Sequence, residues 1–146
     1  MSGTYLPAGL PRPLPDALDA PFWEAAGNGI LAIQRCADCG TWRWGPEWIC
    51  HHCHSFNFKY EEVKAEGLIY SWERVWHPTH PALVNATPYI IALIELPHAG
   101  HVRMVGNLLG DPRQPVAFGA RVRAIFEPHE AGDGMPAFTL VQWKLE

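Results

Sequence analysis

Three absences narrow the functions open to this chain of 146 residues. No apolar run approaches the ~18 residues that a membrane-spanning helix needs, and the longest one, residues 89–94, has the length of a strand. Charge is scarce: 18% of the residues are charged, and the net charge of −4 leaves no basic stripe of the kind that binds nucleic acid. The first residues lack the basic and apolar segments of a secretory signal. We therefore expect a cytoplasmic protein that contacts no membrane, and nucleic acid is not an expected partner.

The sequence also lacks the motifs of several catalytic classes. It contains no Gly-x-Ser-x-Gly nucleophile motif, no phosphate-binding loop and no dinucleotide fingerprint. Eight histidines are present, but none stands in a recognisable nucleophile–base pattern. His77 and His80 lie in a Pro-rich stretch that is typical of a loop. We therefore expect a chain without catalytic residues of its own.

Four cysteines form the one strong motif: Cys36 and Cys39 are followed, after ten residues, by Cys50 and Cys53. Two such pairs can supply the four thiolates of a tetrahedral, structural Zn²⁺ site that has no open position. Three alternatives to zinc are less favoured. Disulfides would need an oxidising compartment, and a redox-active cysteine pair would need a thioredoxin-like βαβ pattern, which the sequence does not show. An iron–sulfur site with the same four ligands is possible, but the two symmetric cysteine pairs favour zinc. Nearby histidines could compete as ligands, but we expect them to face solvent: His51, His52 and His54.

Hydrophobic periodicity predicts a mainly β chain with one short helix. Asp19 is a plausible N-cap for a helix that ends near Ala26, and residues 30–35 alternate as a strand does. Five further strands, separated by Pro or Gly, are predicted at 67–76, 89–96, 102–109, 121–127 and 138–145. This count suits a small barrel or sandwich, and a five-stranded OB-fold barrel fits it. The predicted divisions are a Pro-rich leader at 1–18, a short helix with a zinc ribbon at 19–60 and a barrel at 61–146.

The leader and the aromatic residues that follow it form the predicted interaction surface. The leader has prolines at four positions, so it is either a flexible, polyproline-like tail or an arm that lies along a partner. A ribbon held by a metal has almost no interior in which to bury its indoles, and interfaces are enriched in Trp and Arg. We therefore expect a docking face made by the leader and these residues: Phe22, Trp23, Trp42, Arg43, Trp44 and Trp48.

Two blocks of the sequence, Arg35–Gly40 and Gly67–Trp72, carry a resemblance to a known family. They resemble the Zn-ribbon and OB-fold family catalogued as domain of unknown function thirty-five, and the likeness extends from about Pro21 to Trp143. One departure is His54, because a glycine often follows the second cysteine pair in that family. The resemblance implies a short N-terminal helical segment, a rubredoxin-like zinc ribbon and a C-terminal OB-fold barrel.

The resemblance also implies a function. Members of this family commonly accompany thiolase-like proteins that act on acyl-CoA thioesters, including aldolases that shorten steroid side chains, thiolases, acyltransferases and hydratases. The expected function is thus a non-catalytic accessory subunit of a hetero-oligomeric lyase or acyltransferase, with acyl-CoA as a further candidate ligand. Two alternatives stay open, a stand-alone acyl-CoA-binding module and a nucleic-acid-binding ribbon and OB-fold protein.

Overall fold

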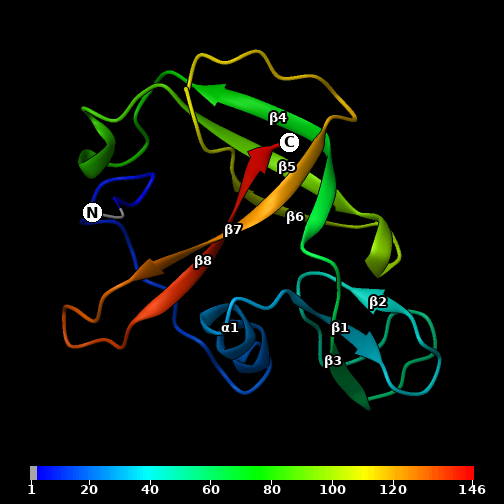
Figure 1. Ribbon diagram of the computed structural model, residues 1–146. Helices are drawn as coiled ribbons and strands as arrows, with labels where there is room; N and C mark the ends of the chain where they lie inside the picture. The colour runs from blue at the N-terminus through cyan, green and yellow to red at the C-terminus, as the bar shows by residue number, and fades with distance from the viewer. Residues whose placement is uncertain (1–2) are drawn as a thin grey trace.

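A computed structural model describes residues 3–146 and shows one α-helix and two antiparallel sheets (Figure 1). The mainly β prediction is confirmed. In chain order the elements are α1 (Ala20–Gly27), β1 (Ala32–Cys36), β2 (Trp42–Arg43), β3 (Phe58–Glu62), β4 (Glu66–Val75), the 3₁₀ helix η1 (Pro81–Leu83), β5 (Tyr89–Leu96), the 3₁₀ helix η2 (Pro97–Ala99), β6 (Val102–Asn107), β7 (Arg121–His129) and β8 (Phe138–Leu145).

The smaller sheet is the ribbon, with strand order β2-β1-β3. β1 is the predicted strand near residues 30–35, whereas β2 and β3 were not predicted. β2 has only two residues and β3 is largely polar, so neither carries the apolar alternation that identifies a strand in a sequence. Both pair antiparallel with β1, which places the two cysteine-bearing turns at one end of this sheet.

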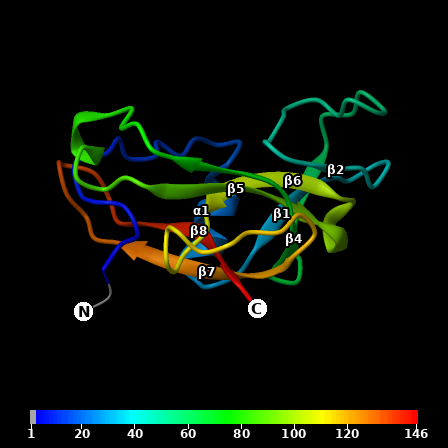
Figure 2. The same ribbon diagram turned by 90° about the horizontal axis from the view of Figure 1, so that it is seen from above.

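The larger sheet has the order β6-β5-β4-β7-β8 and curls into a nearly closed barrel. Its two edges meet where Leu108, directly after β6, forms a parallel bridge with Trp143 of β8, and the Leu109 N–H donates to the Trp143 carbonyl at 2.7 Å. This is the connectivity of a five-stranded OB fold, so the predicted barrel is confirmed. Figure 2 shows the N-terminal segment and the loops of the ribbon on opposite sides of the barrel.

Barrel closure depends on glycines that let strands approach one another. A Cβ at Gly67 of β4 would lie 2.8 Å from the Glu95 carbonyl of β5 and would collide with the Ile94 side chain. A Cβ at Gly106 of β6 would lie 2.8 Å from Cδ1 of Trp143, the fully buried indole at the barrel centre. Neither position has room for a side chain, so both glycines are needed for packing rather than for a turn.

Helix α1 joins the ribbon to the barrel. Its Phe22 is 5% exposed and contacts Trp44 of the ribbon at a ring-centroid distance of 4.8 Å, while α1 also contacts β7 and β8. Asp19 precedes the helix as predicted, but its side chain does not cap it. The Asp19 carboxylate instead accepts hydrogen bonds from the Asp16 amide, at 2.8 Å, and from the Trp23 indole, at 3.3 Å.

The described part of the Pro-rich leader, residues 3–18, lies along the chain's own barrel, so the flexible-tail alternative does not describe it, while the arm along a partner stays a prediction. The Tyr5 amide donates to the Glu127 carboxylate at 2.9 Å, and the Arg12 guanidinium lies over the Phe138 ring at 4.8 Å. These contacts join segments more than 100 residues apart, which no local sequence pattern reveals. We call residues 3–18 the N-terminal arm.

Candidate metal centre

The four cysteine sulfur atoms form a single cluster at the end of the ribbon. All four lie within 4.8 Å of one another, and two of the separations, Cys36 to Cys53 and Cys39 to Cys50, are 3.6 Å. A disulfide would need about 2.05 Å, so the four cysteines are free thiols. Four sulfur atoms placed tetrahedrally about 2.3 Å from a zinc ion are about 3.8 Å apart. The cluster therefore fits one Zn²⁺ ion, as the sequence predicted.

The two cysteine pairs lie on turns of the same construction. The Gly40 amide donates to the Cys36 carbonyl at 3.1 Å, and the His54 amide donates to the Cys50 carbonyl at 2.8 Å. Gly40 has φ +79° and His54 has φ +62°, so both residues adopt the left-handed conformation. His54 thus occupies the position where a glycine was expected, and the turn keeps its geometry although a side chain there is unfavourable.

Backbone amides favour the ionised thiols that bind a metal. The amides of Cys53 and His52 lower the pKa of the Cys50 thiol to about 5. The Ser55 amide acts in the same direction on Cys53, but burial and the three neighbouring sulfur atoms raise the pKa of its thiol to about 12. Four adjacent negative charges repel one another, and a divalent cation is what allows all four thiols to ionise.

The chemistry of this centre is structural. Four thiolates fill a tetrahedral shell, so no position remains for a water molecule or a substrate. Two sulfur ligands belong to buried residues, Cys36 and Cys50, and the other two belong to exposed ones. All three neighbouring histidines are exposed, as expected: His51, His52 and His54.

A buried polar network lies next to the metal centre, and no pattern in the sequence predicts it. Gln34 of β1 and Arg43 of β2 are paired in register, and they are 0% and 2% exposed. The Arg43 Nε donates to the Gln34 Oε1 at 3.0 Å, and both side chains donate to the Glu47 carbonyl, at 2.9 and 3.2 Å. This network fixes the loop that leads to the second cysteine pair. The pairing of Gln34 with Arg43 becomes visible only in the strand register, because glutamine and arginine are mostly exposed in proteins and their presence does not predict burial.

The residues that were predicted to dock a partner differ widely in their exposure. Phe22 and Arg43 lie inside the chain and present almost no surface. Three indoles are half-buried against the chain's own core: Trp23, Trp42 and Trp44. Trp48 alone among the six is well exposed, at 53%.

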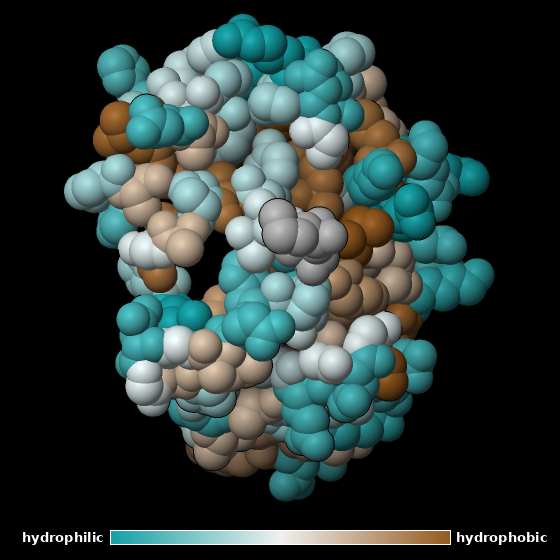
Figure 3. Space-filling model, turned by 60° about the vertical axis from the view of Figure 1, so that its left-hand side comes forward, coloured by the Kyte–Doolittle hydropathy of each residue, from teal (hydrophilic) through white to brown (hydrophobic). Residues whose placement is uncertain are grey.

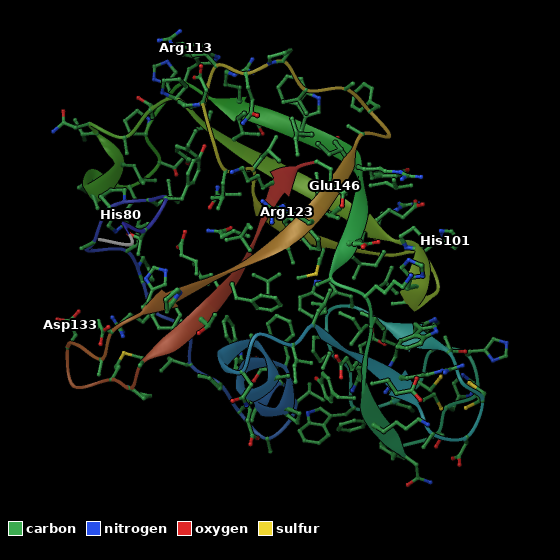
Figure 4. The ribbon with its side chains drawn as sticks, in the orientation of Figure 1. His80, His101, Arg113, Arg123, Asp133 and Glu146 are labelled. Carbon is green, nitrogen blue, oxygen red and sulfur yellow. The ribbon has the colours of Figure 1, made fainter. Side chains whose placement is uncertain are left out.

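Trp48 has exposed apolar neighbours that the sequence analysis did not single out. Ile49 is 44% exposed and Phe56 is 70% exposed. A hydrogen bond of 2.9 Å from the Cys50 amide to the Ser55 carbonyl brings the two segments together. We call Trp48, Ile49 and Phe56 the ribbon-tip patch. His77 and His80 lie in the loop between β4 and β5, as expected; Figure 4 labels His80, whose Nδ1 accepts a hydrogen bond from the Ala82 amide.

Comparison with protein families gives two matches that together cover residues 23–127. Residues 23–59 match the rubredoxin-like zinc ribbon domain of ChsH2, and residues 60–127 match the C-terminal OB-fold domain of ChsH2. A solved structure described as the Ltp2-ChsH2(DUF35) aldolase is 35% identical, with a TM-score of 0.75 over 92% of this chain and 98% of that one. A DUF35 protein of unknown function from Sulfolobus solfataricus has the same fold at 18% identity, with a TM-score of 0.61 over 89% and 86% of the two chains.

Curated relatives are longer proteins. A probable enoyl-CoA hydratase alpha subunit from Thermomonospora curvata is 39% identical over 77% of this chain. The 3-oxo-4,17-pregnadiene-20-carboxyl-CoA hydratase alpha subunit from Mycobacterium tuberculosis is 33% identical over 84%, and the benzoylsuccinyl-CoA thiolase subunit BbsA from Geobacter metallireducens is 30% identical over 66%. The matches cover 34%, 42% and 61% of these relatives' own lengths. Among the described residues, no helix combines the length and apolar character needed to cross a membrane.

Proposed function

Because this chain belongs to the DUF35 family, with the zinc ribbon and OB-fold domains of ChsH2, we propose that it is a non-catalytic accessory subunit of a thiolase-like enzyme that acts on acyl-CoA thioesters. Support comes from relatives named as an aldolase component, a thiolase subunit and hydratase alpha subunits. One of these relatives is named for a pregnadiene carboxyl-CoA, so steroid side-chain degradation is the pathway we favour.

The observation that carries the proposal is the closed metal centre. We assign Cys36, Cys39, Cys50 and Cys53 as the ligands of one structural Zn²⁺, and such an ion can neither polarise a substrate nor activate water. The ion stabilises a ribbon that is too small to hold itself together by hydrophobic burial. On this basis the catalytic residues belong to the partner, and this chain contributes a surface.

We further propose that the subunit works in the cytoplasm and keeps the divisions expected from its sequence. Free thiols at the metal centre need a reducing compartment. The leader (1–18), the helix with the ribbon (19–60) and the barrel (61–146) then form one subunit that a larger enzyme binds.

The proposed docking surface is centred on the ribbon-tip patch. Trp48, Ile49 and Phe56 are 53%, 44% and 70% exposed, and they belong to two segments that the hydrogen bond from the Cys50 amide to the Ser55 carbonyl holds together. The patch lies next to the metal centre, so the zinc ion also fixes the position of these side chains. The half-buried indoles Trp23, Trp42 and Trp44 support the ribbon on the barrel and contribute at most their exposed edges.

Co-expression with a thiolase-like protein from the same organism tests this proposal. We expect a stable complex, and the double variant Trp48→Ala/Phe56→Ala should weaken it by about tenfold or more, because exposed aromatic anchors dominate interfaces. Trp76→Ala/Phe118→Ala is the matched control, since Trp76 and Phe118 are 55% and 74% exposed but belong to the barrel. If both double variants weaken the complex equally, or neither does, docking does not involve the ribbon tip. Tight binding of an acyl-CoA by the isolated chain would instead favour the stand-alone binding module.

A further inference from the structure

The N-terminal arm is attached to the barrel at its two ends, and a cavity lies between the arm and the barrel. At one end, the Tyr5 hydroxyl accepts a hydrogen bond from the Ile90 amide at 3.1 Å, in addition to the Tyr5 contact with Glu127. At the other end, Arg12 donates to the carbonyls of Glu130 and Pro136, which both lie in the loop between β7 and β8. The segment between these anchors forms one wall of a space whose other wall is the barrel.

That space is a cavity of about 420 Å³ between the arm and strands β7 and β8, which we call the arm cavity. Its volume lies in the range of small-molecule sites, about 300–1,000 Å³. Figure 3 views the side of the molecule that carries the arm, and the surface there is deeply hollowed, with apolar side chains visible inside. The site is separate from both the metal centre and the ribbon-tip patch, because it shares no lining residue with either.

The walls of the arm cavity are mainly apolar. Leu6 and Leu10 line it from the arm, and Phe138 and Leu140 line it from β8. These β8 residues alternate with Thr139 and Val141, so they project from the opposite side of the strand. One face of β8 therefore supports the barrel core and the other presents apolar side chains to a cavity.

Two buried polar side chains give the cavity hydrogen-bonding capacity. Glu127 is 8% exposed, and its carboxylate pairs with the His129 Nε2 at 2.7 Å and with the Tyr5 amide. A carboxylate can accept about four hydrogen bonds, so Glu127 has unused acceptor positions. Gln142, 3% exposed, uses its amide oxygen and one N–H on Asn107 and retains a second N–H.

The charged side chains of the lining determine which class of ligand the arm cavity can bind. Three carboxylates line the cavity, those of Glu127, Glu130 and Asp133, and Figure 4 shows Asp133 on the β7–β8 loop. Arg12 is the one Lys or Arg side chain of the lining; its Nη2 donates to two carbonyls and its guanidinium lies over the Phe138 ring, while its buried Nε has no hydrogen-bond partner among the described residues. An anionic ligand would meet three carboxylates against this one guanidinium, so repulsion and the loss of its hydration disfavour it relative to a neutral ligand.

We propose that the arm cavity is a binding site for a neutral, largely apolar small molecule that carries a hydrogen-bond donor, with the N-terminal arm as its outer wall. The donor, a hydroxyl or an N–H, pairs with the Glu127 carboxylate, and the apolar body lies between the leucines of the arm and the outer face of β8. The site does not depend on the proposed partner, so it can be tested on the isolated chain.

The probe for this test is N-phenyl-1-naphthylamine, a neutral apolar fluorophore with one N–H donor. We expect saturable binding of one probe per chain, with a rise in fluorescence. The anionic analogue 8-anilinonaphthalene-1-sulfonate has the same ring system with a sulfonate, and it should bind about tenfold more weakly or worse because its charge would be buried next to carboxylates. Equal affinity for the two probes would overturn the proposal.

Arm variants locate the site. Leu6→Trp/Leu10→Trp places two indoles in the cavity and should weaken the binding of the neutral probe by about tenfold or more. Leu14→Trp is the control, because Leu14 is on the same arm but is 79% exposed and does not line the cavity. Unchanged affinity in the double variant, or an equal loss in the control, would contradict the assignment.

A second measurement on the unmodified chain covers the case in which the double variant does not fold. In an amide NMR titration with the neutral probe, we expect the largest shifts at residues 6–12 and 138–142. Shifts confined to the ribbon-tip patch would mean that the probe binds exposed aromatic side chains, and the arm cavity would then have no ligand role.

Discussion

The substitution His54→Gly tests whether four thiolates are sufficient to hold the zinc ion, because it should stabilise the folded ribbon without removing a ligand. His54 has φ +62° and takes the place that Gly40 takes in the first cysteine turn. A left-handed conformation costs a residue with a Cβ about 1–2 kcal/mol, whereas glycine gives the unfolded chain extra freedom that costs about 0.4–1 kcal/mol. The expected net effect is about 0.5–1 kcal/mol in favour of the folded ribbon.

Zinc retention is the assay, because binding of the ion and folding of the ribbon are coupled. In competition with a chelator, a gain of about 0.5–1 kcal/mol appears as an apparent zinc affinity about two to five times higher. The reverse substitution at the equivalent position, Gly40→Ala, should lower the affinity, because φ is +79° there and the new Cβ would lie 3.4 Å from the Arg35 guanidinium. If His54→Gly instead loses zinc, the imidazole itself supports the ion, and the assignment of four thiolates as sufficient ligands is refuted.

Three further predictions concern the ribbon, the barrel and the junction between them. Cys50→Ser should release the zinc ion and unfold the ribbon while circular dichroism still reports the barrel strands, and retention of a full equivalent of zinc would contradict this. Gly67→Ala should destabilise the chain by about 1–3 kcal/mol and lower its melting temperature by several degrees, whereas Gly27→Ala, at the end of α1 with nothing within 4 Å, should not lower it. Burial and the charge of Asp19 raise the pKa of Tyr60 to about 12 from an ordinary 10.0, so its contribution to stability is present below pH 10 and is lost between pH 10 and pH 12. Thermal unfolding across this range should show the loss in the native chain and less of it in Tyr60→Phe.

Some elements could be predicted from the sequence because their signals are local. The strands β5 and β8 begin and end at the predicted residues, because each coincides with a strand-length, largely apolar run that follows a Pro or Gly. The zinc ribbon was predicted for a similar reason. Two cysteines separated by two residues lie on one tight turn, so the spacing alone places both thiols of each pair near one metal ion.

Other features depend on contacts between distant residues. The arm was expected to be a free tail or a partner contact, but its anchors on Glu127 and Phe138 lie more than 100 residues away. Arg43 was expected at an interface because it stands between two Trp residues. The register of β1 and β2 places it opposite Gln34, where it becomes part of a buried network.

The central claim is that this chain supports an enzyme without catalysing a reaction. The most direct measurement is turnover of an acyl-CoA thioester by the purified chain, by the purified thiolase-like partner and by the two combined. The account predicts no turnover by the chain alone and the highest turnover by the combination, with a reduction for Trp48→Ala/Phe56→Ala that excess subunit restores. Turnover by the chain alone, or a partner whose activity does not change when the chain is added, would contradict it.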